Sequence, residues 1–119
     1  MYGKELILDI HDCDNSLFNR RDLTVFFKRL CDLIDMEREE LHFWDYDNEE
    51  KEFLPPHLKG TSAVQFIRTS NIVIHTLDDL NKVFLNIFSC KPFDDEVASD
   101  FCEKWLKGKV NNRTVVIRE

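Results

Sequence analysis

The stretch Ser62-Ala-Val-Gln-Phe-Ile-Arg-Thr-Ser-Asn-Ile-Val-Ile-His-Thr76 decides the fold. Residues 62–68 have a β pattern, and residues 72–76 are rich in the β-branched side chains that favour extended backbone. Between them, Thr69-Ser70-Asn71 supplies turn-prone residues. The stretch therefore predicts a β-hairpin with Ser70 near its tip.

Further strands are predicted on both sides of this hairpin. Residues 83–89 follow the polar connection 77–82 as a third consecutive strand, which favours an antiparallel meander. Upstream, residues 41–46 alternate in side and have one aromatic-rich face, while residues 6–10 are typical of a largely buried strand. Residues 114–118 are predicted to form a short final strand.

Two amphipathic helices and one long loop complete the elements. From residue 22 to 36, apolar residues recur at three- and four-residue steps, which is the period of one helix face. Residues 94–96 are acidic, as a helix N-terminus favours, and begin a second apolar stripe for which Gly108 is a natural stop. The acidic run and Pro55-Pro56 within residues 47–59 predict a long surface loop.

The order β-α-β-β-β-β-α-β predicts an α+β fold built as a two-layer sandwich. Its 119 residues suit one domain spanning 1–119, in which both helices cover one face of a mainly antiparallel sheet. The other face would hold mixed polar and aromatic residues. An uncovered face of this kind commonly receives a partner, so we expect a homodimer.

Charge and cysteine usage exclude several classes of partner and cofactor. With 23 acidic and 16 basic residues the net charge is −7, which disfavours nucleic acid and anionic membranes as partners. Charges interrupt every apolar stretch, and no signal-peptide pattern opens the sequence, so a cytoplasmic location is expected. The four cysteines include no CxxC pair, and we therefore predict neither a metal site nor a disulfide framework.

The candidates for chemistry are Ser62, Ser70, His75 and Cys90, which fall on the consecutive strands and are predicted to be able to converge. Taken singly, each has a more common structural explanation, as a turn serine, a strand histidine or a small buried thiol. A Cys–His hydrolase using Cys90 and His75 is formally available, although no local signature supports it. Templates such as GxSxG, GxGxxG and HExxH are absent from the sequence.

Three blocks between Gly60 and Cys90 give a more specific reading. Gly-Thr-Ser-Ala at 60–63, Thr-Ser-Asn-Ile-Val-Ile-His-Thr at 69–76 and Phe-Ser-Cys at 88–90 stand in this order. They resemble the GxSG, ESHxxIHT and FTC patterns of the prokaryotic S-adenosylmethionine decarboxylases. The opening Gly3-Lys-Glu-Leu-Ile-Leu-Asp9 is also similar to the start of that family, so the resemblance covers almost the whole chain.

The resemblance implies a proenzyme that cleaves itself between Thr69 and Ser70. It implies a β chain of residues 1–69, an α chain of residues 70–119, and a pyruvoyl group made from Ser70 as the covalent cofactor. That carbonyl would form a Schiff base with the substrate amine and accept the electrons released when carbon dioxide leaves. No metal is required, and the product would serve polyamine (spermidine) biosynthesis.

The same resemblance assigns roles to individual residues. Ser62 and His75 match residues that promote self-processing, and Cys90 matches the proton donor to the decarboxylated carbon. Asp79 matches the acid that holds the ribose hydroxyls, beside Leu77. Tyr46 matches an aromatic residue that stacks on adenine, supplied across a dimer interface.

Departures from the family pattern on either side of Ser70 and at residues 77–79 keep alternatives open. Thr69 replaces Glu, Asn71 replaces His, and Leu77-Asp78-Asp79 replaces an aromatic-Pro-Glu pattern. The last change admits a decarboxylase of another amino acid, since the two acids would suit a cationic side chain. The first two changes admit an uncleaved, non-catalytic paralogue that acts as a binding or regulatory subunit.

Overall fold

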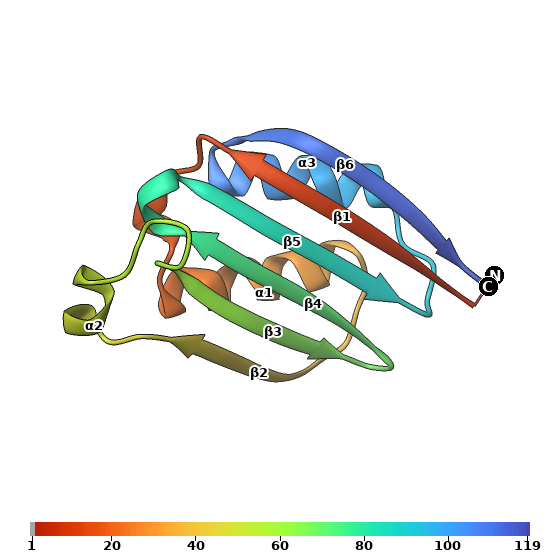
Figure 1. The fold of residues 1–119 in the computed structure, drawn as a ribbon. Coiled ribbons are helices and arrows are strands. Elements are labelled where there is room, and N and C mark those ends of the chain that lie inside the picture. The colour runs from red at the N-terminus through yellow and green to blue at the C-terminus, as the bar shows by residue number, and fades with distance from the viewer. Residues whose placement is uncertain (1) are drawn as a thin grey trace.

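A computed structural model describes residues 2–119, which form one antiparallel sheet with two long helices on one face (Figure 1). The sheet has six strands in the order β2-β3-β4-β5-β1-β6, and every pair is antiparallel. In chain order the elements are β1 (Gly3–His11), η1 (Asn15–Leu17), α1 (Arg20–Leu33), β2 (Arg38–Asp45), α2 (Asn48–Glu52), β3 (Thr61–Ile67), β4 (Ser70–Leu77), η2 (Asp78–Leu80), β5 (Lys82–Ser89), α3 (Asp95–Leu106) and β6 (Lys109–Arg118).

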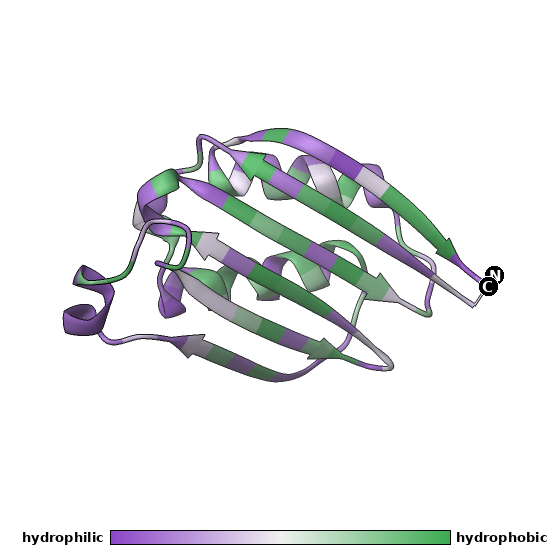
Figure 2. Cartoon of the chain, in the orientation of Figure 1, coloured by the Kyte–Doolittle hydropathy of each residue, from purple (hydrophilic) through white to green (hydrophobic). Residues whose placement is uncertain are grey.

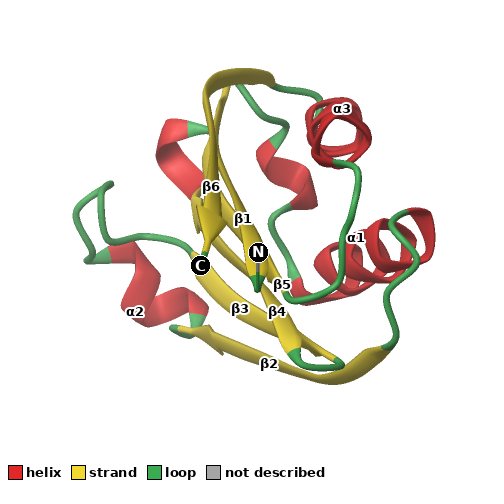
Figure 3. Ribbon diagram, turned by 90° about the vertical axis from the view of Figure 1, so that its right-hand side faces the viewer, coloured by secondary structure: helices red, strands yellow, loops and turns green. Residues whose placement is uncertain are grey.

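The predicted α+β two-layer sandwich is confirmed, including the antiparallel meander from β3 to β5. Viewed along the sheet, α1 and α3 lie on one side and leave the opposite face without a long helix (Figure 3). We call this opposite side the open face. No helix among residues 2–119 has the length and apolar character needed to cross a membrane.

Alternation along the strands separates the two faces. Green and purple segments follow one another along the strands in Figure 2, as a period of two requires. In β4, Ile72 and Ile74 are fully buried beneath the helices, whereas His75 is exposed on the open face. In the middle of the sheet, the side chains that can contact a substrate or partner are therefore those that, like His75, lie on the open face.

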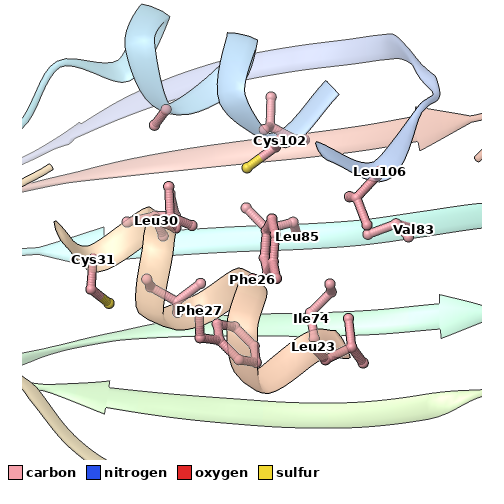
Figure 4. Close-up of a cluster of buried hydrophobic side chains, with 14 of the residues drawn as sticks. Leu23, Phe26, Phe27, Leu30, Cys31, Ile74, Val83, Leu85, Cys102 and Leu106 are labelled. Atoms are coloured by element: carbon pink, nitrogen blue, oxygen red, sulfur yellow. The ribbon is translucent and has the colours of Figure 1, made fainter. Parts of the chain in front are cut away.

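The core lies between the sheet and the two long helices (Figure 4). Phe26 and Phe27 of α1 are fully buried, and the Phe26 ring lies 5.8 Å from that of Phe101 and 5.3 Å from that of Trp105 on α3. Burial of side chains of this size contributes about 1.5–3 kcal/mol each to folding. The aromatic contacts pack α3 against α1, and the two helices together cover one face of the sheet.

Side-chain caps set where the helices begin. The Asn19 side chain accepts a hydrogen bond from the Asp22 N–H at 2.8 Å, so α1 begins at Arg20. The Asp94 carboxylate accepts from the N–H groups of Glu96 and Val97, both at 3.1 Å, at the start of α3. These caps use the polar residues that precede each apolar stripe.

The end of α3 differs from the prediction in one detail. Lys107, with φ 57°, takes the left-handed position that was expected of Gly108. Gly108 is needed for another reason, because a Cβ there would lie 2.6 Å from the backbone oxygen of His11. The final strand is also longer than the predicted 114–118, since pairing with β1 extends it to Lys109.

The predicted surface loop 47–59 contains a short helix, α2, which corrects the expectation of an irregular segment. The Asp47 carboxylate accepts from the Glu50 N–H at 2.8 Å and caps this single turn. In Figure 3, α2 and the loop after it lie on the open-face side of the sheet. The loop is therefore placed beside the face that the long helices leave uncovered.

Candidate functional site

Ser62 and His75 form the first polar pair on the open face. They are register partners on β3 and β4, and the Ser62 Oγ lies 2.8 Å from the His75 Nδ1. Their neighbours Ala63 and Ile74 point into the core, so alternation directs both polar side chains to the open face. The pair joins a hydroxyl to an imidazole, a combination able to relay a proton.

Ser70 and Cys90 form a second pair where β4 begins and β5 has just ended. The Ser70 Oγ accepts a hydrogen bond from the Cys90 N–H at 3.0 Å. Ser70 is 8% exposed, whereas Cys90 is exposed. The Ser70 hydroxyl is thus held by the backbone of a residue whose own thiol is accessible.

A tight turn precedes Ser70. Ile67 pairs with Ser70, which leaves Arg68 and Thr69 as a two-residue connection and confirms Ser70 near the hairpin tip. Thr69 has φ 60°, in the left-handed region that β-branched residues rarely adopt. This conformation costs about 1–2 kcal/mol.

The four predicted residues do not converge at one point in this chain. Ser70 and His75 are five residues apart on the same extended strand, and at about 3.3 Å per residue their Cα atoms lie about 17 Å apart. Strand geometry therefore keeps the Ser62–His75 pair at one end of the sheet and the Ser70–Cys90 pair at the other. The chain therefore carries two separate polar pairs, which we call the half-sites.

A hollow of about 390 Å³ surrounds the Ser62–His75 pair. The predicted residues Tyr46 and Leu77 both line it. Its full lining comes from the ends of β2, β3 and β4, the middle of β5 and the loop before β3, and consists of Trp44, Tyr46, His57, Leu58, Gly60, Ser62, His75, Thr76, Leu77 and Phe84. The aromatic walls suit a flat ligand.

Asp79 lies outside this lining, unlike the other predicted substrate-binding residues. Its carboxylate is 3.0 Å from the Lys59 Nζ, and the neighbouring Asp78 carboxylate is 3.4 Å from the Lys51 Nζ. Both acids of η2 are thus paired with lysines of segment 47–59.

A second hollow lies at the other end of the sheet, against Cys90. Its polar residues form a short network, in which the Asn86 amide donates to Glu5 at 2.9 Å and Arg118 lies 3.1 Å from the same carboxylate. Phe88 completes one side, with the Arg118 guanidinium 6.0 Å from the centre of its ring. The Cys90 thiol therefore opens onto a partly charged surface.

The other three cysteines, Cys13, Cys31 and Cys102, are buried packing residues. Burial raises the pKa of Cys31 to about 11 and that of Cys13 to about 11, so both remain protonated thiols. Burial also raises the pKa of the fully buried Cys102. Cys90 is the exposed member of the four. Within residues 2–119, no cluster of three His, Cys, Asp or Glu side chains has the geometry to hold a metal ion.

Sequence reasoning missed His57 and Phe84 as lining residues. Phe84 carried a partial signal, since it alternates with the buried Val83 and Leu85 and so had to face the open side. His57 carried none, because a single imidazole after two prolines in an aperiodic loop has no pattern that would place it.

The fold has a counterpart among solved structures. The chain matches the crystal structure of the adenosylmethionine decarboxylase from Aquifex aeolicus VF5 with a TM-score of 0.76 and 15% sequence identity. The match covers 99% of this chain and 94% of that one, which establishes a shared fold. No curated protein matches this chain significantly.

The family follows from a comparison with family models. The S-adenosylmethionine decarboxylase model matches residues 4–119, and the chain therefore belongs to that family of carboxy-lyases. The family resemblance inferred from the three sequence blocks is confirmed.

Proposed function

We propose that this chain is a proenzyme that cleaves itself between Thr69 and Ser70 and then decarboxylates S-adenosylmethionine for polyamine (spermidine) biosynthesis. The products of cleavage would be a β chain of residues 1–69 and an α chain of residues 70–119. The observation that carries the proposal is the Ser70 hydroxyl, held by the Cys90 N–H at 3.0 Å directly after the left-handed Thr69.

Cleavage begins with attack of the Ser70 Oγ on the Thr69 carbonyl carbon. The new C–O bond replaces the Thr69–Ser70 C–N bond, which leaves an ester and a free amine on Ser70. Loss of the Ser70 Cα proton then breaks the Cβ–O bond and releases the Thr69 carboxylate. One water hydrolyses the resulting enamine in its imine form, ammonia departs, and a pyruvoyl group remains on residue 70. The residues present fit this group, because Ser70 directly follows the left-handed Thr69 and supplies all three carbon atoms of the pyruvoyl group.

Once formed, the pyruvoyl group would supply an electrophilic carbonyl that accepts the electron pair released with carbon dioxide. The chain's own residues would position the substrate and supply the proton. We assign Cys90 as the proton donor, because its thiol is exposed and its N–H already contacts Ser70. Ser62 and His75 would move the proton needed for processing, through their 2.8 Å contact.

A homodimer would unite the two half-sites. The 17 Å separation along β4, about five strand residues, prevents one protomer from presenting His75 to its own Ser70. A two-fold axis that packs two open faces together would set the Ser62–His75 end of one protomer against the Ser70–Cys90 end of the other. The exposed aromatic residues Trp44, Phe66 and Phe84 on that face support burial there.

Two further features support the substrate and the location. Lysines already neutralise both Asp78 and Asp79, which favours a substrate with a neutral nucleoside over an amino acid with a cationic side chain. Four free cysteines support a cytoplasmic location, since a reducing compartment keeps thiols unpaired.

Intact mass spectrometry of the reduced, denatured protein tests the cleavage. We expect two fragments, 1–69 and 70–119, with the second lighter than a simple hydrolysis product by the mass of ammonia. Ser70→Ala should give one intact chain. Persistence of a single wild-type chain after long incubation would refute the proposal in favour of an uncleaved binding protein.

Mixed dimers test the sharing of half-sites. The His75→Ala and Cys90→Ala proteins are both used in the cleaved form, obtained beforehand or by co-expression. Each should be inactive alone. Refolded together they should recover up to about a quarter of the wild-type decarboxylation, because half of the dimers are mixed and each carries one complete site. Recovery of no activity from verified mixed dimers would refute the sharing of each site between two protomers.

A further inference from the structure

The segment between α2 and β3 makes one wall of the hollow at the Ser62–His75 end. His57 and Leu58 line it, and Gly60 brings the chain against β4 so closely that a Cβ would lie 1.6 Å from the Thr76 oxygen. The wall is therefore a fixed part of the site.

Contacts to η2 hold this wall in place. The Asp78 N–H donates to the Lys59 oxygen at 2.9 Å, Lys59 pairs with Asp79 at 3.0 Å, and Lys51 pairs with Asp78 at 3.4 Å. Thr76 joins the same cluster by donating to the Asp78 carboxylate at 3.0 Å. The two acids thus hold segment 47–59 against the sheet, and lysines of that segment neutralise their charges.

Three polar side chains in the hollow, those of Ser62, His75 and Thr76, already have partners. Ser62 and His75 bond to each other, and the Thr76 hydroxyl accepts from the Thr61 N–H at 2.9 Å while donating to Asp78. His57 is exposed, and its imidazole forms no hydrogen bond to any of residues 2–119. Its ring can act as both donor and acceptor toward a ligand.

We infer that His57 is a specificity-determining residue, which hydrogen-bonds the nucleoside part of the substrate, and that Asp78 and Asp79 serve to hold the loop that carries it. The inference rests on the proposed function. It reassigns the polar recognition of the substrate from Asp79, which lies outside the lining, to an imidazole within it. A hydroxyl or ring nitrogen of the nucleoside satisfies that imidazole while the base packs on the aromatic walls.

Binding of S-adenosylmethionine to uncleaved Ser70→Ala protein, measured by calorimetry, tests the inference without any turnover. Adding His57→Leu to the Ser70→Ala protein keeps a side chain in the wall of the hollow but removes the hydrogen bond to the nucleoside. It should raise the Kd for S-adenosylmethionine about tenfold. His57→Gln should recover most of the affinity. Asp79→Asn should change Kd less than about threefold, because a half-exposed ion pair contributes little. His11→Leu, outside the hollow, is the matched control and should have no effect.

The outcomes separate this inference from the proposed function. If the parent binds but His57→Leu binds equally well, or Asp79→Asn costs more than His57→Leu, the role of His57 is refuted while the decarboxylase remains. If the parent binds no S-adenosylmethionine, the inference and the proposed substrate both fail, and the mass spectrum still reports on cleavage. In the cleaved enzyme, His57→Leu should raise KM far more than it lowers kcat. Thermal melts identify any variant that is not folded.

Discussion

Thr69 allows the role of backbone strain in self-cleavage to be measured. Its φ of 60° places a β-branched residue in the left-handed region, next to the bond that is proposed to break. Asn tolerates this region better than Thr, because its short polar side chain can hydrogen-bond locally. The informative change is therefore Thr69→Asn, which retains a side chain at an exposed position.

The magnitude follows from the cost of the left-handed conformation, about 1–2 kcal/mol. Relief of about half of it should raise the free energy of unfolding by about 0.5–1 kcal/mol. If the same strain is released when the Ser70 Oγ attacks the Thr69 carbonyl, its removal should slow cleavage about two- to fivefold, since about 1.4 kcal/mol corresponds to a factor of ten.

Two assays on matched proteins separate stability from cleavage. Urea unfolding in the Ser70→Ala background gives the free energy, and the rate of appearance of the 70–119 fragment gives the cleavage rate with Ser70 intact. Lys107→Asn is the control, because Lys107 also has a left-handed conformation, φ 57°, but lies at the end of α3 and has no proposed part in cleavage. It should stabilise the protein similarly and leave cleavage unchanged.

The results can contradict the reasoning in two ways. A Thr69→Asn protein that is more stable but cleaves as fast as the wild type would show that the strain is not released on the way to the ester. A protein no more stable than its parent would show that Thr69 carries no strain to release.

Two further predictions concern the fold that supports the site. Phe26→Ala should lower the free energy of unfolding by about 3–5 kcal/mol, because it empties the centre of the core, while Phe53→Ala, at a side chain 86% exposed, should change it by less than about 0.5 kcal/mol; similar values from chemical denaturation would contradict the packing described. Burial raises the pKa of Asp95, but the hydrogen bond and charge of Lys4 and the charge of Arg113 outweigh it and hold that pKa below its ordinary value. The ionised carboxylate therefore stabilises the fold above the unfolded-state pKa of about 3.9, and this contribution is lost as pH falls through the lower folded-state pKa. Lys4→Met should flatten that acid loss in denaturation curves between about pH 2 and 5, and an unchanged pH dependence would disprove the assignment.

The sequence by itself determined the elements whose side chains repeat with a regular period. The alternation from Ser62 to Thr76 predicted the hairpin, and the three- and four-residue steps from residue 22 predicted the helix that is observed as α1. The resemblance of the blocks between Gly60 and Cys90 to the family's patterns also predicted the family. The first two signals are local, because backbone geometry repeats every two residues in a strand and every 3.6 in a helix.

Tertiary structure alone decided how the site residues are grouped. Ser62 meets His75 because register pairs them across β3 and β4, whereas His75 and Ser70 are separated by the length of the strand they share. His57 reaches the hollow through contacts of its loop with η2, which no periodic pattern encodes. Register and loop anchoring are properties of segments brought together from different parts of the chain, and for that reason they became visible only in the folded protein.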